Sequence, residues 1–164
     1  AARKLANEIL SVRAAMMANM LSGEMLIDMT DFEAAETHLQ DAIRIARSLS
    51  NRRMELYCLY ELSRRALGLG QSDKAIEILD QAIAIGRETG INFHGPRLFA
   101  LNAVLRKDPE VCRQSLAEGA ALVAEGANAH NVLWFHRDAI DACLNIGDID
   151  KARSHAEALL NFTV

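Results

Sequence analysis

Two stretches of the chain that begin 40 residues apart decide the fold. They read TDFEAAETHLQDAI, from Thr30 to Ile43, and GQSDKAIEILDQAI, from Gly70 to Ile83. Each carries two small residues seven positions apart with a leucine between them, which gives the trios Ala35, Leu39, Ala42 and Ala75, Leu79, Ala82. Residues at these spacings share one face of an α-helix, and small side chains there let a second helix approach closely. The pattern predicts repeated pairs of interlocking helices.

The same pattern returns twice further along the chain. KDPEVCRQSLAEGA begins at Lys107 and GDIDKARSHAEALL begins at Gly147, so successive copies start 40, 37 and 40 residues apart. The third trio is Cys112, Leu116, Gly119, and the fourth departs from the pattern as Ala152, Ala156, Leu159. The intervening segments agree as well, because the apolar positions of residues 2–24 largely coincide with those of residues 42–64. A period of this length is typical of helical repeat proteins.

The composition agrees with helices and argues against other classes. The 164 residues include 27 Ala and 21 Leu but only 9 Gly and 2 Pro, so neither a β-sandwich nor a doubly wound sheet is expected. The formal net charge of −4 leaves no general excess of positive charge for nucleic acid. The longest uncharged stretch, from Gly126 to His136, is far shorter than the roughly 20 apolar residues that span a bilayer. We therefore expect no nucleic-acid partner and no membrane segment.

Local chemistry places the helix boundaries. Thr30 with Glu33 matches a capping box, and Asp108 before Pro109 matches an N-cap followed by proline in the first turn. Asp148 can accept hydrogen bonds from the free backbone amides that follow it. Glycines at 70, 90, 126 and 147 mark turns. The predicted helices are Ala2–Ile9, Val12–Asp28, Asp31–Ser48, Arg52–Gly68, Ser72–Thr89, Pro96–Arg106, Pro109–Glu125, Asn131–Ile146 and Ile149–Phe162.

The repeats predict a single domain over residues 1–164. Its units are a partial one at about 1–11 and full ones at about 12–50, 51–90, 91–127 and 128–164. The first short helix aligns with the tail of a second helix, so the sequence reads as a fragment of a longer chain. Leu5, Ile9 and Met16 would then lack their natural neighbour, which favours self-association as a homo-oligomer.

The cysteines indicate the compartment. Cys58, Cys112 and Cys143 are an odd number, they form no CxxC pair, and the chain does not start with a basic, cleavable signal segment. A reducing cytoplasm fits this usage best. Each cysteine lies within an apolar helical pattern, so we interpret all three as small buried hydrophobic residues.

Chemistry-bearing motifs are sparse. The sequence contains no GxxxxGK[ST], GxGxxG, HExxH or GxSxG string, which disfavours an enzyme. His136 and Cys143 are seven residues apart, but two ligands of mixed type do not make a convincing metal site, so we expect no metal and no cofactor. Asp138 and Asp141 lie three apart on one helix and, with His136, leave acid–base catalysis as the enzymatic alternative. More often such a carboxylate pair is solvated or pairs with neighbouring arginines.

The repeated segments resemble the second helix of the tetratricopeptide repeat, which also places small residues seven apart around a larger apolar one. The usual repeat has 34 residues, so a spacing near 40 leaves each helix room for roughly one more turn. The resemblance implies an all-α right-handed superhelix, a solenoid of helix hairpins. In such arrays the first helix of each unit lines a concave groove that binds protein partners.

Aligning this chain on that groove nominates a set of binding residues. They are Met17 and Met20 in the first unit, Tyr57, Tyr60 and Arg64 in the second, Arg97 in the third, and Trp134, Arg137, Asp138 and Asp141 in the fourth. Aromatic residues and arginine are favoured at interfaces. One alternative stays open, namely that Tyr57 and Trp134 pack between neighbouring helices instead. We interpret the group Met16, Met17, Met20, Met25 and Met29 as core residues.

The last tract resembles a narrower family. AHNVLWFHRDAIDACLNIGDIDKARSHAEALLNFT, from Ala129 to Thr163, is similar to the tetratricopeptide segment at the C-terminal end of large bacterial proteins related to class III adenylate and guanylate cyclases. The likeness rests on His130, Asn131, Leu133, Trp134, Phe135, Arg137, Asp138, Ala139, Gly147, Asp148 and Ala152. His136 departs from it, because a tyrosine commonly stands there. The resemblance implies a signalling protein whose cyclase and ATPase domains lie outside this sequence.

These observations favour a non-enzymatic interaction or regulatory domain that binds a protein segment, or another domain of its own chain, in the groove. A second interpretation is the ligand-sensing repeat array of a transcription activator of the LuxR or MalT type. The enzymatic alternative uses Asp138, Asp141 and His136.

Overall fold

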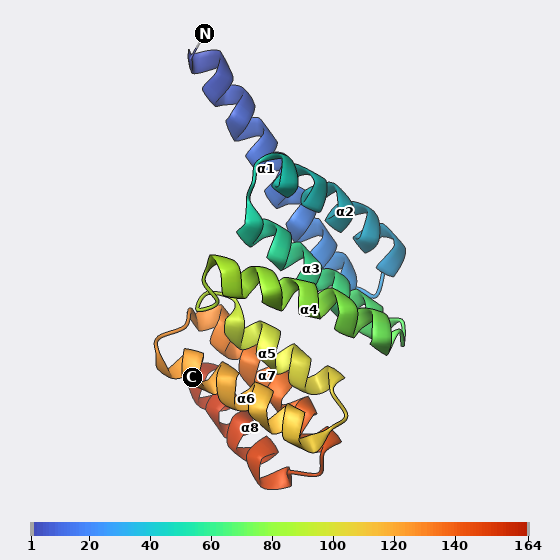
Figure 1. Cartoon of the computed structure of the whole chain (residues 1–164), viewed down its shortest axis with the longest axis vertical. Coiled ribbons are helices and arrows are strands. Elements are labelled where there is room, and N and C mark those ends of the chain that lie inside the picture. The colour runs from blue at the N-terminus through green and yellow to red at the C-terminus, as the bar shows by residue number, and fades with distance from the viewer. Residues whose placement is uncertain (1, 164) are drawn as a thin grey trace. The chain divides into compact units, whose positions relative to one another are not determined.

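The computed structural model describes residues 2–163 of the chain, and their side chains from Leu10 to Phe162 (Figure 1). These residues form eight α-helices and no β-strand. The helices are α1 (Ala2–Asp28), α2 (Phe32–Ser48), α3 (Arg52–Gly68), α4 (Ser72–Thr89), α5 (Gly95–Leu105), α6 (Pro109–Ala124), α7 (Ala129–Asn145) and α8 (Ile149–Thr163). They hold 84% of the chain, which confirms the predicted all-α repeat fold.

The chain divides into two compact units, residues 1–85 and residues 86–164. In the first unit, α1 and α2 form a hairpin. Helix α3 packs mainly against α2 and also contacts α1, and α4 pairs with α3. The trio Ala35, Leu39 and Ala42 is fully buried, as the small-residue pattern predicts. Gly23 of α1 lies so close to Leu39 that a Cβ atom added there would come within 2.5 Å of Leu39 Cγ.

The second unit also contains two helix hairpins, α5 with α6 and α7 with α8. Helix α7 packs against α5 and pairs with α8, and its Phe135 ring lies against Gly119 of α6. The core of this unit consists mainly of small side chains: Ala100, Ala103, Cys112, Leu116, Phe135, Ala139, Ala142, Cys143 and Ala152. Small residues throughout explain how these helices approach closely.

The three cysteines are free and buried, as predicted. Burial, reinforced by the carboxylates of Glu61 and Glu55, raises the pKa of Cys58 to about 12. Burial also raises the pKa of Cys112 and of Cys143. Because the thiolate is the reactive form, all three cysteines are structural residues.

Two boundary predictions are wrong. The predicted break between Ala2–Ile9 and Val12–Asp28 does not occur, because α1 continues from Ala2 to Asp28. The intervening residues, Leu10 and Ser11, include no glycine or proline that would end a helix. The predicted capping box is also wrong: the N-cap of α2 is Asp31, whose carboxylate accepts a hydrogen bond from the Ala34 amide at 3.2 Å.

The caps predicted at two aspartates are confirmed. The Asp108 carboxylate accepts hydrogen bonds from the amides of Glu110 and Val111, at 2.8 and 3.1 Å. The Asp148 carboxylate accepts one from the amide of Lys151 at 3.2 Å. Each satisfies backbone donors that a helix start leaves without an intrahelical acceptor.

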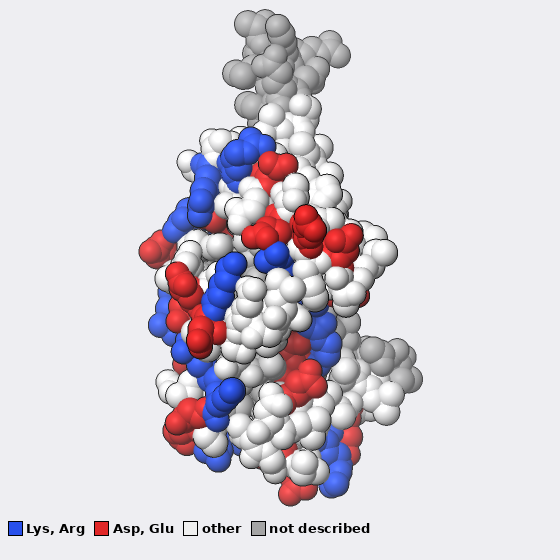
Figure 2. Space-filling model, turned by 90° about the vertical axis from the view of Figure 1, so that its right-hand side faces the viewer, with Lys and Arg blue, Asp and Glu red and all other residues white. Residues whose placement is uncertain are grey.

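Figure 2 shows acidic and basic side chains interspersed over the face drawn. None of the described helices is both long and apolar enough to cross a membrane.

Candidate protein-binding site

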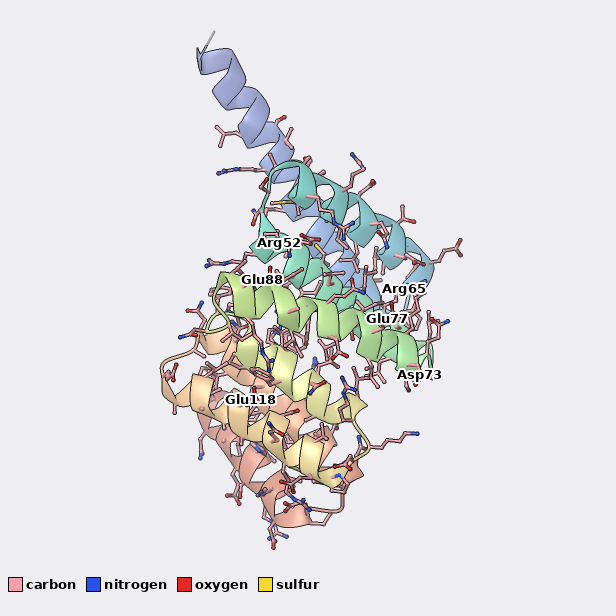
Figure 3. All side chains as sticks on the ribbon, in the orientation of Figure 1. Arg52, Arg65, Asp73, Glu77, Glu88 and Glu118 are labelled. Carbon is pink, nitrogen blue, oxygen red and sulfur yellow. The ribbon has the colours of Figure 1, made fainter. Side chains whose placement is uncertain are left out.

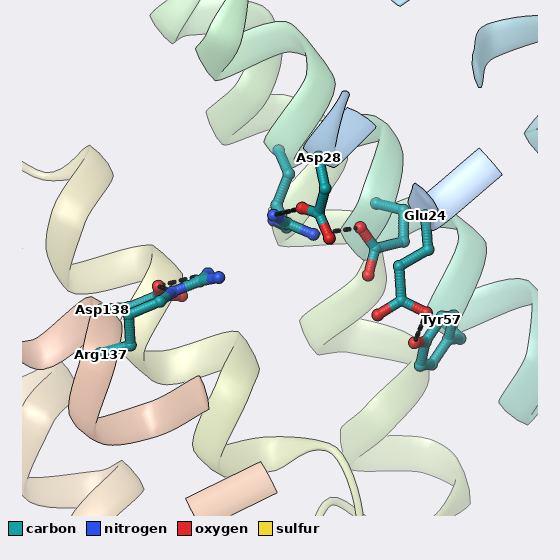
Figure 4. A network of polar contacts seen from close by, with 7 residues as sticks. Glu24, Asp28, Tyr57, Arg137 and Asp138 are labelled. Carbon is teal, nitrogen blue, oxygen red and sulfur yellow. Dashed lines mark hydrogen bonds and ion pairs between the residues drawn. The ribbon is translucent and has the colours of Figure 1, made fainter. Parts of the chain in front are cut away.

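In the first unit, the nominated residues of α3 lie among carboxylates of α1 (Figure 4). The Tyr57 hydroxyl donates a hydrogen bond to Glu24 Oε2 at 2.7 Å. Arg64 bridges two helices, with Nη2 at 2.7 Å from Asp28 Oδ1 and Nη1 at 2.8 Å from Glu61 Oε2. Tyr57 is 9% exposed and Tyr60 is 2% exposed, so both aromatic rings pack mainly inside this unit.

Charge balance explains why Arg64 is tolerated with so little exposure. Burial by itself lowers the pKa of Arg64. The nearby Glu61 carboxylate, together with Tyr60 and Asp28, outweighs burial, so the pKa is raised overall. A buried charge is stable only when it is paired and hydrogen-bonded. Asp28 keeps 48% of its side chain exposed, so the outer end of this network remains accessible.

Arg65 and Glu55 anchor the two ends of α3 to α2. Arg65, labelled in Figure 3, donates from Nε to the Phe32 carbonyl at 2.6 Å and pairs with Glu36. Near the other end, Glu55 accepts hydrogen bonds from Arg47 and Arg52. Burial raises the pKa of Glu55, but these two arginines outweigh it and lower the pKa overall.

In the second unit, the nominated residues gather around the only tryptophan of the sequence. The guanidinium carbon of Arg137 lies 3.9 Å from the centroid of the Trp134 ring, and that of Arg97 lies 5.1 Å from it. Both distances are within the range of cation–π attraction. Arg137 also pairs with Asp138 at 2.6 Å and keeps 40% of its side chain exposed.

The nominated residues differ in how much of each side chain is exposed to a partner. Tyr60, Arg97 and Asp138 are buried, at 2, 1 and 5% exposure. Trp134 and Arg137 are half-buried, and Asp141 is exposed. Burial was outside the reach of the sequence alignment, because it depends on which neighbouring helix covers each position.

Trp134 and Arg137 border an apolar cleft between α7 and α8, with a volume of about 680 Å³. Leu133 and Ile140 of α7 line it together with Ala156, Leu159 and Leu160 of α8. We call this the α7–α8 cleft. Sequence reasoning nominated none of these five residues. One signal for them was present, namely the large Leu159 where earlier trios carry a small residue.

The enzymatic candidates do not form a common site. His136 Nδ1 lies 3.0 Å from Nδ1 of His155 on α8, whereas Asp138 pairs with Arg137. Asp141 is exposed, and none of the three lines the α7–α8 cleft. Among the described residues, no group of three or more His, Cys, Asp or Glu side chains is placed to hold a metal ion.

The methionine prediction is only partly correct. Met16 and Met20 are buried, at 2 and 4% exposure, whereas Met17, Met25 and Met29 are exposed at 39, 63 and 70%. Helical periodicity separates them, since Met16 and Met20 share a face that Met17 and Met25 do not. The burial of Met20 also removes it from the groove. Of the residues expected to drive self-association, Met16 is buried, and Leu5 and Ile9 lie outside the described side chains.

Comparison with known families agrees with this geometry. Residues 13–88 match the tetratricopeptide repeat. This tetratricopeptide segment contains two helix hairpins, α1 with α2 and α3 with α4, including the network around Arg64. Tetratricopeptide repeats generally mediate interactions between proteins. A comparison with curated proteins finds no match.

Proposed function

We propose that this chain is a non-enzymatic interaction domain that binds a protein segment, or another domain of its own chain, against the first helices of its units. The observation that carries the proposal is the half-exposed Trp134 ring with Arg137 stacked on it, at the border of an apolar cleft. An aromatic ring beside a planar cation is the combination that anchors partners at interfaces. The tetratricopeptide match supports the same reading.

We further propose the setting that the last tract suggests. The domain would belong to a cytoplasmic bacterial signalling protein related to the class III adenylate and guanylate cyclases. Its catalytic domains would then lie elsewhere in the full-length chain. The support is the likeness over residues 129–163, where Trp134 and Arg137 are among the matching residues.

The test is calorimetric titration with amphipathic peptides that carry apolar residues at helical spacing and one glutamate. Replacing Trp134 by alanine should weaken binding by about 2 kcal/mol, roughly thirtyfold, while the fold changes little. Replacing Arg137 by alanine should weaken binding of the glutamate peptide more than binding of a peptide with glutamine in its place, because a carboxylate gains most from the guanidinium. Val111→Ala, at an exposed position of α6, serves as the matched control.

A Trp134→Ala variant that loses stability but keeps its binding affinity would contradict this role. If Trp134 is a packing residue, its removal should cost roughly 3 to 5 kcal/mol of unfolding free energy through the cavity left behind. Affinity retained in the folded fraction of Trp134→Ala would then remove Trp134 from the site.

A second candidate function rests on the cleft volume. About 680 Å³ lies within the range of pockets that bind small molecules, and the lining is largely apolar. This favours the ligand-sensing interpretation, in which an apolar compound occupies the cleft. An apolar compound that changes Trp134 emission and raises the melting temperature would support it. The same compound should lose its effect on Ala156→Leu, which fills the cleft.

A further inference from the structure

Helix α3 shows how a first helix sits on the pair before it. Its residues Tyr57 and Arg65 contact α1 and α2, through Glu24 and through the Phe32 carbonyl and Glu36 respectively. Glu61 lies between them on the same side of α3 and is fully buried. Positions 57, 61 and 65 therefore mark the face by which a first helix packs on the preceding hairpin.

The corresponding face of α1 is apolar and exposed. The residues 40 positions before 57, 61 and 65 are Met17, Leu21 and Met25, which are 39, 48 and 63% exposed. Leu10 continues the line at 64% exposure. These four residues, which we call the α1 stripe, fall on one side of the helix by their spacing. The polar groups that α3 uses at this face, Glu61 and Arg65, have apolar counterparts in α1.

The α7–α8 cleft corresponds to the surface on which α3 sits. Adding 117 to positions of α1 and α2 gives the lining of the cleft: Met16 becomes Leu133, Met20 becomes Arg137, Gly23 becomes Ile140, Leu39 becomes Ala156, Ala42 becomes Leu159 and Ile43 becomes Leu160. The seventh lining residue, Trp134, corresponds to Met17, which belongs to the α1 stripe. In the first unit, where α3 covers the hairpin, Ile43 is 3% exposed. Leu160, at the same position of the repeat, is 64% exposed.

We propose that the α1 stripe of a second copy of this chain packs into the α7–α8 cleft, as α3 packs on α1 and α2. The inference deepens the proposed function, because it names the protein segment that lies beside Trp134. The contact joins two different faces, so each copy offers one stripe and one cleft, and association proceeds head to tail.

Charges at the equivalent positions are compatible with this contact. In the first unit, Tyr57 meets Glu24 and Arg64 meets Asp28. In the proposed contact, Met17 of the second copy would meet Asp141, and Glu24 would meet Asn145. No like charges oppose each other at these two places. A cleft packed against a second cleft would instead bring two copies of Arg137 together.

The experiment is sedimentation velocity on the whole chain over a range of concentrations, with one variant for each face. Wild type should gain mass as concentration rises. Leu21→Glu places a charge in the stripe and Leu160→Glu places one in the cleft, and each variant alone should stay monomeric. An equimolar mixture of the two should form a 1:1 pair and nothing larger, because only one intact stripe and one intact cleft remain. Val111→Glu, the same change at an exposed position of α6, should associate like wild type.

Three results would overturn the inference. They are a wild type that stays monomeric at high concentration, a Leu21→Glu variant that still associates, and a mixture that fails to pair although circular dichroism shows both variants folded. The second result would indicate contact between two clefts. A monomeric chain that still binds the amphipathic peptides at Trp134 would overturn this inference while leaving the proposed function intact.

Discussion

Thr30 occupies a backbone position that glycine holds in other repeats of this chain. Its φ is 62°, close to the 72° of Gly70 and the 76° of Gly147, which stand 40 and 117 residues later. All three residues form the turn between the helices of a hairpin. Left-handed backbone is unfavourable for a β-branched residue, whereas glycine adopts it freely.

Thr30→Gly should therefore raise the free energy of unfolding by about 1 kcal/mol. The reason is relief of the left-handed strain, offset in part by the greater chain entropy of glycine when unfolded. Urea melts of wild type and variant check this value. The reciprocal change Gly147→Thr is the matched control and should destabilise; a Thr30→Gly variant less stable than wild type would contradict the account.

At the residue scale, sequence reasoning nominated candidate binding residues but could not tell which of them are accessible. The repeat alignment selected Trp134 and Arg137, which border the cleft, because aromatic and arginine side chains at first-helix positions are recognisable in sequence. It also selected Tyr60 and Arg97, which are buried. The difference depends on packing between helices far apart in sequence, which a position within one repeat does not encode.

At the scale of helix pairs, the small-residue rule explains both the regular trios and the exception. In the first hairpin, Gly23 leaves space that Leu39 fills. In the last hairpin the sizes are exchanged, with Ile140 on the first helix and Ala156 on the second. The fourth trio therefore departs from the pattern without losing the volume that the pair must fill. The sequence pattern considered only the second helix of each pair, so it did not predict that the large residue would move to the first helix.

Ala75→Leu tests the rule in a regular pair. Ala75 is fully buried, and the Ser63 hydroxyl donates to its carbonyl at 2.7 Å, so added methylenes have no free space. The substitution should reduce the free energy of unfolding by roughly 1 to 3 kcal/mol. A denaturant melt gives the number. Ala34→Leu, one position before the buried trio of α2, is a useful control because the side chain of Ala34 is less buried than Ala35. Equal, negligible effects at both sites would show that the register is wrong.

The contact between His136 and His155 makes the last hairpin sensitive to pH. Burial lowers the pKa of both imidazoles, and for His155 the neighbouring His136 and Lys151 lower it further, while Asp148 acts in the opposite sense. In the unfolded chain these groups titrate near their ordinary pKa of about 6.5. The folded state therefore binds fewer protons just below that pH, and its stability falls as the pH drops.

Urea midpoints between about pH 7.5 and pH 5.5 should therefore decline as the pH is lowered, in the window where histidine rather than carboxylate titrates. His155→Gln should show a shallower decline, because it removes one imidazole and the repulsion between the two. His130→Gln is the matched control, since it removes a histidine outside this contact. A decline of the same size in wild type and His155→Gln would show that another group is responsible.

At the scale of the whole chain, repetition accounts for how much the sequence could predict. A period near 40 residues fixed the all-α class and most helix ends, because each copy confirms the others. The repeat alignment gave a wrong boundary near the start of α1. There it suggested a break at Leu10 and Ser11, which the local sequence does not support. The α7–α8 cleft was also outside its reach, because a cleft is visible only when the exposure of equivalent residues is compared.

The emission spectrum of Trp134, measured as a function of protein concentration, shows whether a partner helix lies in the α7–α8 cleft. Trp134 is the only tryptophan, and it borders the cleft into which the α1 stripe of a second copy should pack. Emission should move to shorter wavelength as the chain associates, because the indole becomes less exposed to water. Leu160→Glu should remove this shift. Association of the wild-type chain with an unchanged Trp134 spectrum would contradict the claim that the cleft is where the partner helix lies.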